Sequence, residues 1–345
     1  MKKTFLVVGS AKPPGARQSQ YIELKNALND MGLEESKTLE SDLVVFVNYN
    51  KKILRKLKNH HLKLVLIRLE PRAVLPIQYK KRIESKFDLI ITPGGQIDSE
   101  SKFIGWPYKY DLNPSKPDPR FTSLKSVIRE AVDEGFFEIE QWNAKKNAVV
   151  LVAANKVSPS SNSNYRIRRH LAKNLSPQFL YVYGPLWQTS IINLIVHRIR
   201  VMVYSIRTGY LPNIKEIYGN VFAKYPNFVS EPEDKHKVIR EFKYSLVIEN
   251  SSDYCSEKIF DAMINGSIPI YVGPKIAEKY LPSSLYLWCN GTAQELTTLV
   301  EKLTEKKTAD MLKSMKEYLV SNKFSENWES DKVYKKIAKE IRDLI

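Results

Sequence analysis

Short apolar segments alternate with amphipathic segments along this chain, and the alternation occurs twice. The first series has strand-like segments at residues 4–10, 42–49, 62–69 and 87–93, and segments with helical spacing at 18–32, 51–61 and 76–86. Continuous apolar strands separated by amphipathic helices are typical of a parallel sheet that is covered by helices on both faces. The first part of the chain is therefore predicted to form a doubly wound α/β domain.

The alternation restarts after residues 105–120, which are rich in proline and turn residues. The second series has strand candidates at 147–155, 178–184, 244–250, 268–273 and 285–289, and helix candidates at 164–175, 190–206, 234–242 and 256–265. We predict Rossmann-like domains over residues 1–145 and 146–325, and a final helix over 326–345 that packs back on the core. Ligands of open α/β sheets bind at the carboxyl ends of the strands, so two facing domains predict a binding cleft between them.

The chain has 54 Lys and Arg against 38 Asp and Glu, a formal net charge of +16. This charge implies an acidic partner, which could be a nucleic acid, an anionic membrane surface or a phosphorylated ligand. The basic residues are spread widely and no nucleic-acid recognition motif is found, so a nucleic-acid-binding protein without catalysis is kept only as an alternative. A membrane-binding alternative rests on the last helix, where Val333, Ile337 and Ile341 share one face among lysines, although that face also suits packing on the core.

Cys255 and Cys289 are far apart in the sequence and form no CxxC pair. They predict neither a disulfide framework nor a cysteine metal site, which fits a reducing compartment. The apolar run near the start of the chain is too short for the core of a signal peptide. Charged residues interrupt the apolar segment 190–206, which is predicted to be a core helix near a surface rather than a membrane span. We expect a cytoplasmic protein, and peripheral contact with the inner face of a membrane stays open.

Polar and charged side chains are concentrated between two apolar strands in the segment 244–274, YSLVIENSSDYCSEKIFDAMINGSIPIYVGP. Ser256 is in position to cap the intervening helix, and Gly266 is in position to end it. Glu257 in the first turn suits the helix dipole, whereas Lys258 there is misplaced by about a few tenths of a kcal/mol. An anion at the helix N-terminus would explain this lysine, and so would a lysine that points to solvent.

The segment 247–274 resembles the signature of the α1,3-fucosyltransferases, glycosyltransferase family 10. The family pattern is Phe-Glu-Asn-Ser, then Tyr-x-Thr-Glu-Lys, a helix, a Pro-containing strand and a Gly-Pro turn. This chain has Ile248 for the Phe and Ser256 for the Thr, and its turn before Tyr254 is shorter. Residues 149–175, followed by YVYGPLW, and residues 64–76, followed by KFDLIITPGG, are similar to other family segments in outline.

The resemblance implies a fold of the GT-B type, with two Rossmann-like domains facing a cleft. It also implies an inverting transfer of L-fucose from GDP-β-L-fucose to a hydroxyl of an oligosaccharide or glycoconjugate acceptor, α1,3 to GlcNAc or a related sugar. A family member that uses another GDP-sugar donor is the nearest alternative. No nucleic-acid partner is expected.

The resemblance also implies roles for particular residues of the C-terminal domain. Arg168 and Lys258 would neutralise the leaving diphosphate, because the fork of donors on an arginine matches phosphate oxygens. Glu249 and Asn250 would lie near the fucose, while Tyr254 and Glu257 would address the ribose or the diphosphate. Ser256 completes the donor-binding set, and the weaker candidates are Arg166, Arg169, Tyr183 and Gly184. The alternative for the three arginines is an exposed basic face of a helix.

Glu70, at the carboxyl end of the strand 62–69, is implied to be the general base that takes the proton from the acceptor hydroxyl. Partial burial would raise the pKa of its carboxyl toward a useful value, and a salt bridge to Arg68 or Arg72 is the structural alternative. The sequence has no Asp-x-Asp pair of the kind that holds a nucleotide-sugar diphosphate through a divalent metal. We therefore expect no bound metal and no cofactor besides the donor.

Overall fold

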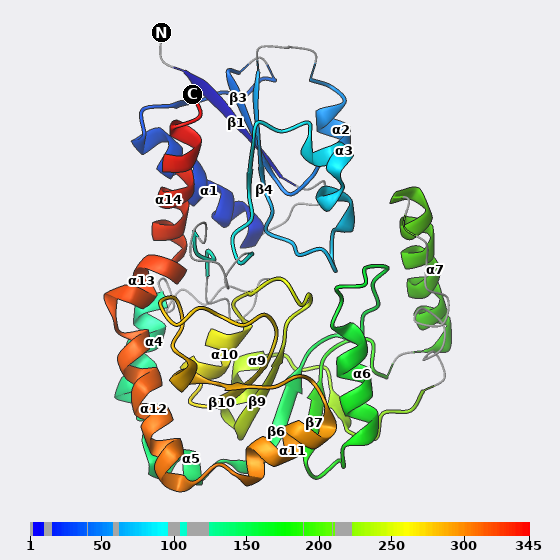
Figure 1. Ribbon diagram of the computed structural model, residues 1–345, viewed down its shortest axis with the longest axis vertical. Helices are drawn as coiled ribbons and strands as arrows, with labels where there is room; N and C mark the ends of the chain where they lie inside the picture. Colours follow the sequence, from blue (N-terminus) through cyan, green and yellow to red (C-terminus); the bar gives the residue numbers. More distant parts are fainter. Residues whose placement is uncertain are drawn as a thin grey trace.

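The computed structural model describes residues 3–9, 16–39, 41–57, 62–95, 104–108, 124–188, 190–208, 210 and 223–345. Its strands form two parallel sheets, one in each half of the chain, which confirms the predicted pair of α/β domains (Figure 1). The first sheet has the order β2-β1-β3-β4-β5, with β1 at Thr4–Gly9, β2 at Glu34–Glu35, β3 at Leu43–Val47, β4 at Lys63–Ile67 and β5 at Leu89–Ile91.

The second sheet has the order β11-β10-β9-β6-β7-β8. Its strands are β6 at Lys146–Val152, β7 at Leu180–Tyr183, β8 at Phe228–Ser230, β9 at Phe242–Ile248, β10 at Ile268–Val272 and β11 at Leu287–Trp288. All pairs in both sheets are parallel, so the strands of each sheet end at one edge, where ligands of such sheets bind.

The helices connect these strands and cover their faces. In the N-terminal half they are α1 (Ala16–Asp30), α2 (Lys51–Leu54), η1 (Pro76–Tyr79, a 3₁₀ helix) and α3 (Lys81–Glu84). They continue with α4 (Leu124–Asp133), α5 (Ile139–Asn143), α6 (Tyr165–Asn174), α7 (Ile191–Thr208), α9 (Lys235–Arg240) and α10 (Lys258–Ile264). The last are η2 (Ser283–Leu285, also 3₁₀), α11 (Ala293–Glu301), α12 (Glu305–Leu319), α13 (Asn322–Trp328) and α14 (Ser330–Arg342).

Two predicted helices of the first domain are shorter in the structure. The helix expected over 51–61 is ordered as α2 for one turn, and residues 58–61 lie outside the described part of the chain. The helix expected over 76–86 is divided into η1 and α3 by Lys80, whose backbone is extended with φ −84° and ψ 131°. The side chain of Lys80 donates to the carbonyl of Thr208, so a tertiary contact accompanies this break.

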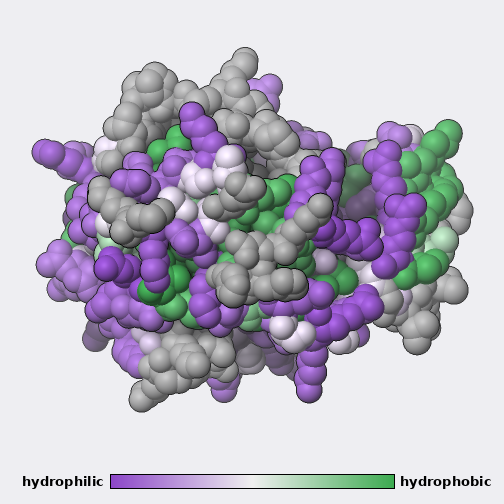
Figure 2. Space-filling view, turned by 90° about the horizontal axis from the view of Figure 1, so that it is seen from above, coloured by the Kyte–Doolittle hydropathy of each residue, from purple (hydrophilic) through white to green (hydrophobic). Residues whose placement is uncertain are grey.

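The prediction of a core helix over 190–206 was wrong in one respect. The segment forms α7, but five large aliphatic side chains along one side of this helix are exposed, including Ile192 at 73%. Figure 1 draws α7 at the right-hand edge of the molecule, and Figure 2 shows hydrophobic side chains gathered at that end. None of the described helices combines the length and the apolar composition that a membrane crossing requires.

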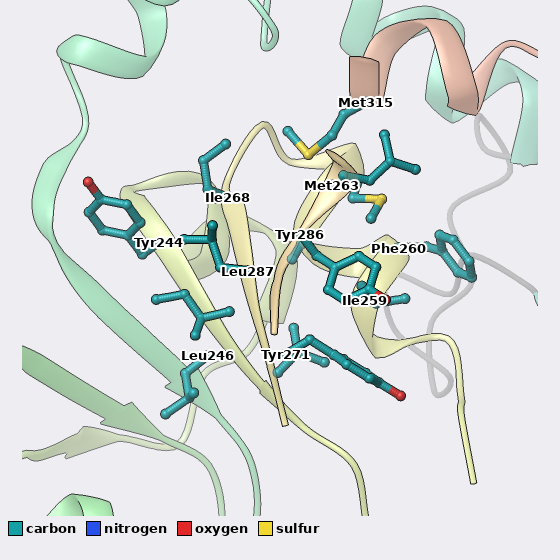
Figure 3. Packing of buried hydrophobic residues seen from close by; sticks show 14 of the residues in the cluster. Tyr244, Leu246, Ile259, Phe260, Met263, Ile268, Tyr271, Tyr286, Leu287 and Met315 are labelled. Atoms are coloured by element: carbon teal, nitrogen blue, oxygen red, sulfur yellow. The ribbon is translucent and has the colours of Figure 1, made fainter. Parts of the chain in front are cut away.

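The core of the C-terminal domain lies between its sheet and α10. Tyr244 and Leu246 of β9, Ile268 and Tyr271 of β10, and Ile259 of α10 belong to one buried cluster (Figure 3). Full burial of a large aliphatic side chain contributes about 1.5–3 kcal/mol, so this packing fixes α10 firmly on the sheet. The polar segment that precedes α10 is therefore held in a defined position at the end of β9.

The last helix returns to the N-terminal domain. Val333, Ile337 and Ile341 of α14 are 0% exposed and share a core with Leu24 and Leu28 of α1. In Figure 1, α14 runs alongside α1 near the two chain ends. The membrane-binding alternative for this helix was therefore wrong, because the face that it required is buried inside the protein.

Candidate active site

Glu249 follows the last residue of β9 and is only 1% exposed. Its carboxylate accepts hydrogen bonds from the backbone nitrogen of Ser256 at 2.8 Å and from the Ser256 hydroxyl at 2.7 Å. The ammonium of Lys258 lies 3.0 Å from the same carboxylate and also donates to the Ser256 hydroxyl at 2.6 Å. A buried carboxylate is tolerated only with partners of this kind, so Glu249 positions both Ser256 and Lys258.

The charge of Lys258 is set by two opposing effects. Burial acts to lower its pKa, but the carboxylates of Glu249 and Glu257 outweigh burial and raise the pKa above the ordinary lysine value. Lys258 is therefore cationic at neutral pH. Its position also explains the lysine that the sequence placed at the beginning of a helix, because the ammonium pairs with Glu249 instead of pointing away into solvent.

The prediction that Ser256 caps α10 was wrong. The helix begins at Lys258, and Glu257 occupies the capping position with a helical φ of −63° and no side-chain capping bond. The Ser256 hydroxyl bonds to Glu249 instead. At the other end Gly266 has a φ of +60° and follows the helix as predicted, and a Cβ there would lie 2.0 Å from the carbonyl oxygen of Phe136.

Arg168 of α6 is 3% exposed and reaches the end of β9. Its Nη2 donates to the carbonyl of Ile248 at 2.8 Å and to Oδ1 of Asn250 at 2.8 Å. Its Nε is buried and has no hydrogen-bond partner among the described residues. The neighbouring candidates differ, because Arg166 is exposed and Arg169 donates to the carbonyl of Lys156 at 2.5 Å. Only Arg168 of the three is bonded to Asn250.

Tyr183 and Gly184, at the end of β7, contact other parts of the C-terminal domain. The Tyr183 ring packs against Phe242, with 6.3 Å between the ring centroids. Gly184 has a φ of +127° and donates its backbone N–H to the carbonyl of Ser230 at 3.0 Å. A Cβ on Gly184 would lie 2.6 Å from the carbonyl oxygen of Ala153, so the glycine permits two backbone segments to approach closely.

Tyr254 joins the polar segment to the N-terminal domain. It is 2% exposed, and its hydroxyl donates to the carbonyls of Arg68 and Leu69 at 3.0 Å and 3.1 Å. The next residue continues the contact, because the backbone N–H of Cys255 donates to the carbonyl of Gly94 at 2.8 Å. The donor-binding role of Tyr254 stays a prediction, and the structure adds that its hydroxyl holds the two domains together.

The short turn before Tyr254 is fixed by Asp253. One carboxylate oxygen of Asp253 accepts from the Ser251 hydroxyl at 2.6 Å, and the other accepts from the side-chain amide of Asn162 at 3.0 Å. Asn162 precedes α6, the helix that carries Arg168. The turn is thus tied to the loop before α6. This contact holds the helix that carries Arg168 in a fixed position relative to the segment 249–258.

Glu70 lies just beyond β4 and is partly buried. Its backbone N–H donates to Oδ1 of Asn48 at 3.0 Å, and its carbonyl accepts from the side chains of Gln78 and Tyr79. These bonds fix the backbone at the carboxyl end of β4. The arginines that were its alternative partners pair with other carboxylates, since Arg68 lies 2.7 Å from Glu84 and Arg72 lies 3.8 Å from Asp253.

Tyr165, the first residue of α6, is a buried residue beside Arg168. Burial raises the pKa of the Tyr165 hydroxyl; Arg168 and Lys258 oppose that rise, and Glu70 adds to it. The guanidinium carbon of Arg168 lies 4.9 Å from the centroid of the Tyr165 ring. The pKa of this buried hydroxyl therefore depends on charges from both domains.

Sequence reasoning missed two residues of this region. Tyr165 could have been found from its i, i+3 spacing to Arg168, which places both on one face of a helix. Lys235 gave no such signal: its ammonium lies 2.6 Å from Asp261, and it lines a small cavity beside β6 and β9 together with Asp261 and Lys258. Among the described residues, no group of His, Cys, Asp and Glu side chains is arranged to hold a metal ion.

Comparison with known proteins gives a family match in the C-terminal half of the chain. The family model "Glycosyltransferase family 10 (fucosyltransferase) C-term" matches residues 200–321. A fucosyltransferase-like protein of Arabidopsis thaliana is 40% identical over 53 residues, which is 15% of this chain and 10% of the relative. The 4-galactosyl-N-acetylglucosaminide 3-alpha-L-fucosyltransferase 9 of Mus musculus is 34% identical over 76 residues, 20% of each chain. The matched segments thus span a small part of these relatives.

Among solved structures, the Anabaena protein HepE in complex with UDP and glucose is similar over 99% of this chain and 100% of its own, with a TM-score of 0.52 and 12% identity. This likeness concerns the fold, and it agrees with the two parallel-sheet domains described above. The family match covers the Glu249–Lys258 segment and most of the second sheet. Residues 200–321 of this chain are therefore similar to the C-terminal part of glycosyltransferase family 10, a family of fucosyltransferases.

Proposed function

We propose that this chain is an inverting glycosyltransferase that moves L-fucose from GDP-β-L-fucose to a hydroxyl of a glycan acceptor. The observation that carries the proposal is the end of β9, where Glu249 holds Lys258 and Asn250 holds Arg168, and which the Tyr254 hydroxyl joins to the strand end before Glu70. This set combines a carboxylate for proton removal with two cations for a leaving diphosphate. The names of the matched relatives support fucose as the sugar, and that of the mouse relative supports a 3-linkage to N-acetylglucosamine.

In the proposed reaction, Glu70 accepts the proton of the acceptor hydroxyl as the oxygen attacks the anomeric carbon of the fucose. Lys258 and Arg168 stabilise the negative charge that develops on the diphosphate, a contribution of about 3 kcal/mol for a well-placed group. Both cations are already oriented, Lys258 by Glu249 and Arg168 by Asn250, so little reorganisation is needed when the charge develops. A single displacement inverts the anomeric centre, and the β-linked donor yields an α-fucoside.

The donor is tested with the purified full chain and a panel of nucleotide sugars that includes GDP-fucose, GDP-mannose and UDP-glucose. We expect turnover of GDP-fucose with a mixture of glycan acceptors and an α-linked product whose linkage is read by NMR. The rate is expected to persist in EDTA, because the proposed cations are side chains. Turnover of GDP-mannose without turnover of GDP-fucose would replace the donor in this proposal and keep the family.

The base is tested with Glu70→Gln, which keeps the shape of the side chain and removes its basicity. General base catalysis contributes roughly 10²–10⁴-fold, so a loss of this size is expected in kcat with donor affinity retained. Glu301→Gln, at an exposed position on α11, is the matched control and is expected to retain full activity. Full activity of Glu70→Gln would exclude Glu70 as the base. A basic binding protein without catalysis would instead show tight, salt-sensitive binding to random RNA and no turnover.

A further inference from the structure

The helix α7 has two faces of opposite character. Its inner face carries Leu194, Arg198, Ser205 and Thr208, all buried. Its outer face, called here the α7 outer face, is a stripe of large aliphatic side chains at alternating spacings of four and three residues, with 36–73% exposure: Ile192, Val196, Ile199, Val203 and Ile206. A stripe of this spacing runs along one side of a helix, here for about 20 Å.

Exposed aliphatic side chains are concentrated on this helix. Among the described residues, eleven large hydrophobic side chains are exposed, and six of these belong to α7. Figure 1 places α7 to one side of both sheets, and Figure 2 shows the corresponding hydrophobic group next to hydrophilic side chains. Singly scattered exposed hydrophobic residues need no explanation, but a contiguous patch marks an interaction surface.

The inner face and the C-terminal end of α7 hold it on the protein. The carbonyl of Thr208 accepts a hydrogen bond from the ammonium of Lys80. Tyr210 follows, and its hydroxyl donates to the carbonyl of Pro76 at 2.8 Å while its ring lies 4.4 Å from the Lys80 ammonium. The helix of the C-terminal domain is thus anchored to η1 of the N-terminal domain, and this anchoring leaves the outer face pointing away from the protein.

Charge decides between the partners that an apolar stripe could bind. Residues 191–208 contain no Asp or Glu, and Arg200 and Arg207 are exposed one heptad apart beside the stripe. A second copy of this face would bring arginines toward arginines without a carboxylate of the helix to pair with them. An anionic lipid surface complements the arginines and accepts the aliphatic stripe, which is the behaviour of interfacial helices.

We propose that α7 is an interfacial helix that docks this protein on an anionic lipid bilayer. The helix lies parallel to the bilayer, its outer face enters the boundary between headgroups and acyl chains, and Arg200 and Arg207 contact the anionic headgroups. The net charge of +16 adds attraction at longer range. The inference does not depend on the donor or on the reaction proposed above. It assigns to α7 the membrane contact that the buried face of α14 excludes for that helix.

The test measures co-sedimentation of the full chain with vesicles. One set is phosphatidylcholine with one third phosphatidylglycerol, and the other is phosphatidylcholine alone. The apolar variant is Ile192→Ser with Ile206→Ser, and its matched control is Ile22→Ser with Val320→Ser, two residues of similar exposure outside α7. The charge variant is Arg200→Gln with Arg207→Gln. Its control is Arg55→Gln with Arg129→Gln, which are also exposed.

We expect the wild-type chain to bind the anionic vesicles and to bind pure phosphatidylcholine far more weakly, with binding reduced by high salt. The apolar variant and the charge variant should each lower partitioning at least about tenfold, whereas both controls should match the wild type. Absence of vesicle binding by the wild type, or equal losses in a variant and its control, would overturn the proposal. So would a dimer in sedimentation equilibrium that the apolar variant dissociates, since the occupant would then be a second copy of this chain.

Discussion

The hydroxyl of Tyr254 in the C-terminal domain donates to the backbone carbonyl of Leu69, 3.1 Å away in the N-terminal domain. Leu69 immediately precedes Glu70, and Tyr254 lies four residues before Lys258. One hydrogen bond therefore connects the strand end that carries the proposed base with the segment that carries a proposed diphosphate ligand. The relative position of these two groups depends on this contact and on the neighbouring bond from Cys255 to Gly94.

Replacing Tyr254 with Phe removes the hydroxyl and keeps the ring, which packs edge-on against Trp106 with 5.4 Å between centroids. The carbonyls of Arg68 and Leu69 lose a buried donor, so we expect the free energy of unfolding to fall by about 1 kcal/mol. Transfer activity should fall further than stability explains, because the domains lose a positional constraint. Urea unfolding and steady-state kinetics check both effects, with Tyr181→Phe as a control; equal behaviour of the two variants would contradict the prediction.

Two glycines with the same backbone conformation allow the effect of backbone strain on stability to be separated from the effect of the contact between the domains. Gly94 and Gly135 both have a φ of +74°. A Cβ on Gly94 would lie 2.2 Å from the carbonyl oxygen of Cys255, whereas a Cβ on Gly135 would meet nothing closer than 3.5 Å. Both alanine variants should lose about 1–2 kcal/mol to backbone strain.

Gly94→Ala should lose more stability than Gly135→Ala, because the added methyl group forces the two domains apart. Only Gly94→Ala is expected to lower kcat as well, since the proposed base and the proposed cations lie on opposite sides of this contact. Parallel urea unfolding curves and kinetics of the two proteins measure the difference. If both variants lost the same stability and the same activity, the contact between Gly94 and Cys255 would have no special role.

Replacing Lys258 alone is expected to cost more stability than replacing Glu249 and Lys258 together. Lys258→Met leaves a carboxylate that is 1% exposed without its charge partner, which should cost about 3 kcal/mol of stability. The double variant Glu249→Gln with Lys258→Met should recover part of this loss, because no unpaired carboxylate remains at position 249. A double-mutant cycle from chemical denaturation measures the coupling, and additive losses would show that the pair does not interact.

The same pair gives a prediction in alkaline solution. The pKa of Lys258 is raised in the folded protein, so the stability that its charge contributes is complete below the unfolded lysine value of 10.5 and is lost as the pH rises through the higher folded value. The stability difference between wild type and Lys258→Met should therefore stay constant up to the unfolded lysine value of 10.5 and shrink as the pH rises further. Unfolding measured at a series of alkaline pH values checks the trend.

The elements that could be predicted from the sequence are those with one dominant local signal. The apolar runs of β9 and β10 mark buried parallel strands, and Gly266 marks the end of α10, because each depends on residues close in sequence. The exposed side of α7 could not be predicted, since apolar residues occur on most sides of that helix and tertiary packing selects which side is covered. The cap of α10 was mispredicted because a buried carboxylate seven residues earlier, Glu249, takes the Ser256 hydroxyl.

The candidate site also contains residues that the sequence could predict and residues that it could not. Glu249, Asn250 and Lys258 are close in sequence and were proposed together, and the structure brings Arg168 to Asn250. Lys235 was missed because its position depends on how α9 packs on the sheet, whereas Tyr165 had a local signal in its spacing to Arg168. The approach of Glu70 to this region depends on the arrangement of two domains, which no local pattern encodes.

The buried imidazole of His236 is expected to lower the stability of the protein in acid. His236 is 1% exposed, and burial, with a smaller contribution from Lys235, lowers its pKa from 6.5 to about 2. Between these values the unfolded chain binds a proton that the folded protein does not, so stability should fall as the pH drops below 6.5, by at most about 1.4 kcal/mol per pH unit. His236→Asn should flatten this slope, although it also loses packing at all pH values. Urea unfolding from pH 7 to pH 4 compares wild type, His236→Asn and the exposed control His170→Asn; parallel curves for all three would contradict the prediction.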